Sequence, residues 1–138
     1  MLLLPAEFLG KTVQFLVDSC AERSVIPKQL IPDALLYPTN VILNAAGGNK
    51  IETFGQCSHK IGVKGLRRDF LVNLIVTNTQ PIFGANFLTN NTLQLDMKRR
   101  VLTDPETNIS AQLIAQEGPS LQLKAVEVVY YNIFTKFP

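Results

Sequence analysis

The residues best suited to chemistry lie together in the short segment Asp18-Ser19-Cys20-Ala21. This segment offers a carboxylate, a hydroxyl and a thiol, and it follows residues 13–17, which are apolar except for Gln14. Of the eleven acidic residues, Asp18 alone combines a preceding apolar run with a hydroxyl neighbour in a turn of small residues. A carboxylate placed in this way suits general acid or base catalysis. The alternative is an ordinary acidic residue in a turn.

Other chemistries fit the sequence less well. A nucleophilic Cys20 would need a neighbouring base, and His59 is the only histidine. His59, Cys20 and Cys57 lack the spacing of metal ligands, so we expect no metal and no cofactor.

Short strands are expected to position Asp18. Residues 11–18 are rich in β-formers and nearly continuous in apolar character, which indicates a strand buried on both faces. Residues 85–91 are long enough for two helical turns. Further strands are predicted at 24–26, 57–63, 68–76, 82–83, 93–95 and 101–102. Many short strands with one short helix predict an all-β barrel.

A hairpin is predicted where the β-rich residues 41–43 and 51–54 flank a glycine-rich tip. Glycine and asparagine tolerate the positive φ that such turns require.

Length and composition indicate one compact domain. The chain has 138 residues, of which 46% are hydrophobic and 17% charged. We expect a domain at residues 1–104 and a linker-like extension at 105–138, where proline and glycine interrupt the pattern. The net charge of +2 argues against a dedicated nucleic-acid surface.

The cellular setting is predicted from the cysteines and the first residues. Two distant cysteines are too few for a disulfide framework and favour a reducing compartment. Residues 1–5 are apolar but lack a basic leader and the length of a spanning helix. We therefore expect an intracellular, cytoplasmic protein without membrane contact.

Three motifs resemble those of retropepsins, and especially the proteases of gypsy-class retrotransposon polyproteins. Residues 15–26 resemble the active-site loop, in which two hydrophobic residues precede Asp, Thr or Ser, Gly and Ala. Residues 45–51 resemble the flap, and residues 80–88 resemble the hydrophobic-hydrophobic-Gly motif and the helix that close the fold. The likeness spans roughly residues 10–104, with the motifs in the family's order.

The resemblance implies a single-lobed aspartic endopeptidase that is active as a homodimer. Peptide hydrolysis without a metal needs one carboxyl group to take a proton from water while another donates one to the carbonyl oxygen. One chain supplies one such residue, Asp18, so the other must come from a second copy. Extended peptides, such as processing sites in a polyprotein, would be the substrate.

The same resemblance assigns supporting roles around Asp18. Ser19 would hydrogen-bond across the two-fold axis, and Cys20 and Ala21 would complete the loop. Residues in the flap would close over the peptide, and a later set of residues in the sequence would pack beneath the Asp18 loop. The flap set is Ala46, Gly47, Gly48 and Asn49, and the packing set is Ile82, Phe83 and Gly84.

Cys20 departs from the family, which has glycine at this position. A side chain here would crowd the approach of the second copy, and a positive φ would be costly. Two interpretations stay open: an active protease whose loop has adjusted, or a catalytically impaired dimerisation or peptide-binding module on the same fold.

Overall fold

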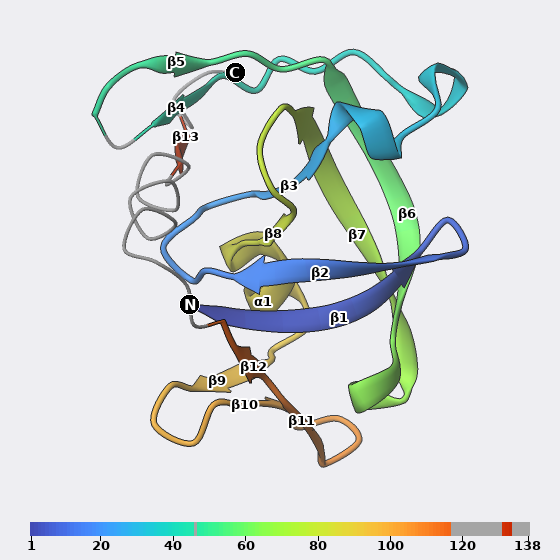
Figure 1. The fold of residues 1–138 in the computed structure, drawn as a ribbon, viewed down its shortest axis with the longest axis vertical. Helices are drawn as coiled ribbons and strands as arrows, with labels where there is room; N and C mark the ends of the chain where they lie inside the picture. The colour runs from blue at the N-terminus through green and yellow to red at the C-terminus, as the bar shows by residue number, and fades with distance from the viewer. Residues whose placement is uncertain (46, 117–130, 134–138) are drawn as a thin grey trace.

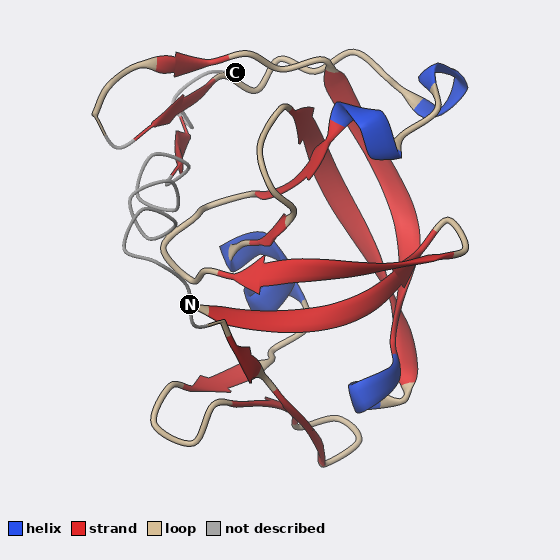
Figure 2. Cartoon of the chain, viewed as in Figure 1, coloured by secondary structure: helices blue, strands red, loops and turns tan. Residues whose placement is uncertain are grey.

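The computed structural model describes residues 1–45 and 47–116 and the backbone of residues 131–133 (Figure 1). Strands dominate, joined by short 3-10 turns and, among the described residues, one short α-helix (Figure 2). The elements are β1 Leu2–Phe8, β2 Lys11–Val17, β3 Ser24–Pro27, η1 Lys28–Leu30, η2 Asp33–Leu35, β4 Leu43–Ala45, β5 Lys50–Ile51, β6 Gly55–Val63, η3 Lys64–Leu66, β7 Arg68–Thr77, β8 Ile82–Phe83, α1 Ala85–Asn90, β9 Gln94–Asp96, β10 Val101–Asp104, β11 Ile109–Gln112, β12 Ile114–Ala115 and β13 Tyr131–Ile133.

The main sheet closes into a barrel, which confirms the predicted fold class. Its strands follow the order β1-β2-β8-β3-β7-β6, and Glu7 of β1 pairs with Gly62 of β6 to close the ring. Strand β8 runs parallel to β2, and β3 runs parallel to β7. Strand β8 also pairs with β3 in antiparallel register, so it lies between the end of β2 and the start of β3, which is where Asp18 lies.

Burial explains why these residues form strands. In β2, Phe15, Leu16 and Val17 are all buried, as expected for a strand covered on both faces. Strand β1 instead alternates between buried and partly buried residues. Strand β1 is not among the strands predicted from the sequence, because the consecutive leucines at its start hide this alternation.

A second layer of strands lies below the barrel in Figure 1. Strands β9, β10 and β11 form an antiparallel sheet, and β12 pairs with β1. Asp104 of β10 is fully buried and accepts a hydrogen bond from Arg68 of β7 at 2.9 Å. The boundary predicted after residue 104 falls within the β10–β11 hairpin, and strands continue to Ala115. For the rest of the extension, the linker stays a prediction.

A small separate sheet carries the predicted hairpin. Strands β4 and β5 pair in the register Leu43↔Ile51 and Asn44↔Lys50, which is shorter than the runs expected from the sequence. The other edge of β4 pairs with β13.

Candidate active site

Asp18 lies at the point where β2 leaves the barrel. Its backbone N–H donates to the carbonyl oxygen of Phe83 at 3.0 Å, continuing the parallel ladder between β2 and β8. Its side chain is partly exposed, and one carboxylate oxygen accepts the backbone N–H of Cys20 at 3.0 Å. The N–H of Ala21 donates to the Asp18 carbonyl oxygen at 3.2 Å. These bonds fix the carboxylate at the first residue of a tight turn.

The turn presents Ser19 and Cys20 to solvent and buries Ala21. Cys20 is not among the residues with positive φ, so its Cβ causes no strain of the left-handed kind. The cost that a positive φ at position 20 would carry therefore does not arise in this backbone. What stays open is crowding against a second copy.

Gly84 packs directly beneath this loop. A Cβ built on Gly84 would lie 2.5 Å from the carbonyl oxygen of Arg23 and 2.6 Å from that of Ala21. The next residue, Ala85, donates its N–H to the Ala21 carbonyl oxygen at 2.6 Å. Only glycine allows this close approach of two backbones. The structure thus places residues 82–84 against the Asp18 loop.

A buried polar network fixes the far side of the loop, and sequence reasoning missed it. Ser24 is fully buried, and its Oγ accepts the Gly84 N–H at 2.9 Å and donates to Asn86 Oδ1 at 2.8 Å. The Asn86 amide nitrogen donates to the Asn73 carbonyl oxygen at 3.2 Å. Arg23 donates to the Asn73 side chain, and burial lowers the pKa of its guanidinium. No local pattern marks Ser24, because its partners lie far along the chain.

Aromatic rings support the same region from inside the barrel. Phe15 and Phe83 stack with their ring centroids 3.9 Å apart, and Phe83 stacks on Phe87 at 4.1 Å. This column joins β2, β8 and α1 under the Asp18 loop.

The hairpin tip is a tight, hydrogen-bonded turn. Ala45 donates its N–H to the Asn49 carbonyl oxygen and Gly48 donates to that of Ala45, each at 2.8 Å. Gly48 has a φ of +91°, which glycine adopts without cost. Gly47, Gly48 and Asn49 are exposed, whereas Ala46 lies outside the described residues. At the base of the hairpin, Leu43 is fully buried in one apolar cluster with Ala21 and Ile82.

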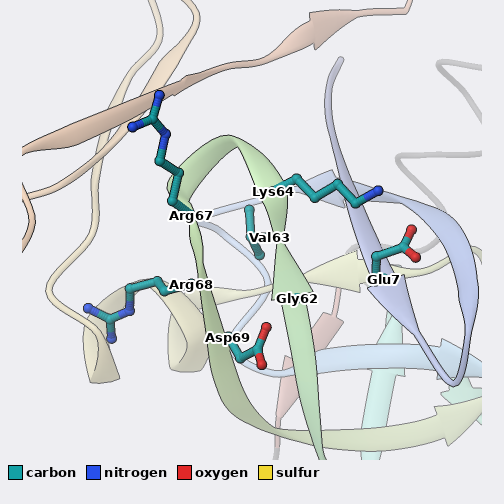
Figure 3. A pocket seen from close by; sticks show the side chains of 7 residues that line it. All are labelled: Glu7, Gly62, Val63, Lys64, Arg67, Arg68 and Asp69. Atoms are coloured by element: carbon teal, nitrogen blue, oxygen red, sulfur yellow. The ribbon is translucent and has the colours of Figure 1, made fainter.

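A hollow on another part of the surface is separate from this site. It has a volume of about 670 Å³ and is lined by residues of β1, β6, η3 and β7, among them Glu7 and Lys64, and by Arg67 between η3 and β7 (Figure 3). Glu7 pairs with Thr12, near the start of β2, whereas Asp18 follows the end of that strand. The hollow therefore lies at the opposite end of β2 from Asp18.

The described residues contain no group of three or more His, Cys, Asp or Glu side chains that could hold a metal ion. The His59 ring packs edge-on to Phe8, and its Nδ1 lies 3.2 Å from the Lys60 carbonyl oxygen. Cys57 is buried, and this burial raises the pKa of its thiol. In the described part of the chain, no helix is both long and apolar enough to cross a membrane.

A closed single-lobed barrel with a carboxylate loop resting on a glycine motif defines the class of single-domain aspartic proteases. The chain belongs to the retroviral aspartyl protease family, whose profile matches residues 3–96. Among solved structures, it is similar to the retroviral protease-like domain of Ddi1 from Leishmania major. The two share 20% sequence identity with a TM-score of 0.66, over 86% of this chain and 98% of that domain. No curated protein sequence matches the chain.

Proposed function

We propose that the protein is an aspartic endopeptidase of the kind that processes retroelement polyproteins. It would hydrolyse extended peptides with a pair of Asp18 carboxyl groups, one from each chain of a homodimer. The observation that carries the proposal is the Asp18 loop itself. The loop is tied to β8 through Phe83, and its carboxylate is oriented by the Cys20 N–H.

The proposed chemistry follows from this placement. One Asp18 carboxylate takes a proton from a water molecule, and its protonated counterpart donates one to the carbonyl oxygen of the scissile peptide. Two carboxyl groups close enough to share a proton cannot both ionise easily, which separates the two roles. Ser19 is exposed beside them and would brace the paired loops across the two-fold axis.

The flap residues would bind substrate rather than react with it. A glycine-rich tip lets backbone amides approach an extended peptide, and its closure excludes water from the two carboxyl groups. The burial of Leu43 with Ala21 supports this role, because it fixes the base of the hairpin beside the catalytic loop.

The free thiols of Cys20 and Cys57 support a reducing, cytoplasmic setting.

A second candidate function is a dimerisation or peptide-binding module without catalysis. It is favoured by Cys20, whose exposed side chain stands beside Asp18 where the family has glycine. A bulkier group there would hold the two Asp18 loops apart while leaving the flap and barrel intact.

A peptide cleavage assay across the acid pH range tests the proposal. The purified chain should cleave extended peptides, and Asp18→Asn should lower the rate by at least roughly 10²-fold to 10⁴-fold, because it removes the proton-transferring group. Asp33→Asn is the matched control, since Asp33 is an exposed carboxylate that pairs with Lys28. If the wild-type chain binds peptides without cleaving them, the binding module is the better description.

A further inference from the structure

The flap hairpin is a three-stranded sheet whose third strand comes from the far end of the chain. Strand β5 covers one edge of β4, and β13 covers the other in antiparallel register (Figure 1). The paired residues are Tyr131↔Ala45, Asn132↔Asn44 and Ile133↔Leu43. We call the β13 side of β4 the flap edge.

The backbone directions at the flap edge can be read from the hairpin. Ala45 donates its N–H to Asn49, so its polar groups face the β5 side. Because these groups alternate along a strand, the N–H and C=O of Asn44 face the flap edge. Asn132 lies opposite Asn44, so its own N–H and C=O face β4. Those of Tyr131 and Ile133 point away.

The position of the flap edge relates it to Asp18. Leu43, the first residue of β4, shares an apolar cluster with Ala21 of the Asp18 loop. The chain also leaves the barrel at this end, because Gln116 donates to the Met1 carbonyl oxygen and Ala115 pairs with Leu2. Gln116 and the strand that begins at Tyr131 therefore both lie near the Asp18 end of the barrel.

We propose that the segment Tyr131–Ile133 is an intramolecular occupant of the flap edge and blocks the binding of extended peptides there. An extended peptide joins a sheet through the same backbone groups that β13 now engages, so both cannot bind together. This inference rests on the proposed function in one respect: the flap edge is taken as the edge that receives the substrate strand. The segment must leave before a peptide can pair with β4.

The expected size of the block follows from effective concentration. A tethered segment acts at roughly millimolar concentration. For a segment that binds with a dissociation constant on the order of 100 µM, this weakens the binding of a competing peptide about tenfold. Release of the segment should strengthen peptide binding by the same factor.

Two proline variants of the full chain separate the backbone pairing from other effects. Asn132→Pro removes an N–H that faces β4, whereas Ile133→Pro removes one that faces away. Both prolines favour an extended preceding residue, so they differ mainly in the lost donor. Each variant is made in the Asp18→Asn background, which prevents cleavage during binding measurements. The probe is a fluorescein-labelled peptide with the sequence of residues 128–136.

Peptide affinity and amide hydrogen exchange at Asn44 are then measured. Asn132→Pro should bind the peptide about tenfold more tightly than the parent and speed exchange at Asn44 at least tenfold, with Ile133→Pro close to the parent. Protection of Asn44 should not change on dilution, because the contact is intramolecular. Equal peptide affinity in all three proteins, or protection lost on dilution, overturns the proposal.

The outcomes distinguish a failure of the proposed function from a failure of this inference. If the chain with Asp18 intact never cleaves peptide, while peptide binding and Asn44 exchange respond to Asn132→Pro, the block stands and the endopeptidase does not. If cleavage depends on Asp18 but neither binding nor exchange responds, the endopeptidase stands and the block does not.

Discussion

At the residue scale, the Asp18 carboxylate is oriented by the backbone of Cys20 and not by its side chain. The Cys20 N–H donates to Asp18, and its thiol lies exposed at the surface of the turn. A change of side chain at position 20 should therefore leave the carboxylate in place within one chain. Its effects should appear where a second chain approaches.

We predict that Cys20→Gly raises activity and slightly lowers stability. Glycine removes the group that would crowd the paired loop, which should tighten the dimer and raise kcat/KM. Because Cys20 does not have positive φ, glycine relieves no strain there. The free energy of unfolding should fall by up to roughly 1 kcal/mol, because glycine raises the entropy of the unfolded chain. Urea denaturation, sedimentation and peptide cleavage measure the three effects. A folded, dimeric and inactive glycine variant would exclude Cys20 as the cause of any impairment.

We also predict that Ser24→Ala lowers the free energy of unfolding by about 1–3 kcal/mol, because it leaves the buried Gly84 N–H and the Asn86 side chain without their partner. Ser110→Ala is the matched control, since Ser110 is exposed and should change stability by less than about 0.5 kcal/mol. Thermal or urea denaturation compares the two. An equal effect of both variants would mean that the Ser24 network contributes nothing specific.

At the element scale, the site depends on the contact between the Asp18 loop and the strand-to-helix junction at Gly84. We predict that Gly84→Ala costs about 1–3 kcal/mol of stability, because its Cβ would lie under 3.0 Å from two backbone carbonyl oxygens. The loop must then shift, and a displacement of about an ångström lowers activity on the order of a hundredfold.

Gly47→Ala provides the control for this effect. Gly47 has open space around it and no positive φ, so its stability should change by less than about 0.5 kcal/mol. Urea denaturation of the two variants makes the comparison. Similar losses of stability in both would show that the close approach at Gly84 does not hold the loop.

Most of the strands and the short helix around Asp18 could be predicted from the sequence. The run before Asp18 is a buried strand, as predicted, and the short helix after Gly84 begins at Ala85. Strand β1 was missed because Pro5 and the leading leucines hide its alternation. The Ser24 network could not be predicted, since it depends on the parallel placement of β3 and β7, which brings Ser24 near Asn73 and Asn86. The pairing of β13 with β4 equally depends on tertiary structure.

At the scale of the whole molecule, a single lobe carries one Asp18, so the proposed dyad requires two chains. We predict that mixing wild-type chains with equal amounts of Asp18→Asn chains leaves roughly a quarter of the dimers with both carboxylates, if pairing is random. After the subunits exchange, the activity per total dimer should therefore fall to about a quarter of the wild-type activity. The peptide cleavage rate of pre-equilibrated mixtures measures it.

The control for mixing is the same experiment with Asp33→Asn chains, which should leave the activity per dimer unchanged. Activity that falls only in proportion to the wild-type fraction would mean that each chain acts alone. That outcome would remove the shared dyad.

The parallel ladder between β2 and β8 has a consequence for the order in which the protein is made. The Asp18 N–H is bonded to Phe83, so the loop cannot be completed until residue 83 has left the ribosome. At about 5–20 residues per second, β2 waits on the order of several seconds for its neighbour. During that time an apolar strand is present without its parallel partner, as a surface that aggregates or binds chaperones. Completion of the Asp18 loop is therefore a late event in synthesis, and fragments that stop before residue 83 carry Asp18 without the strand that supports its loop.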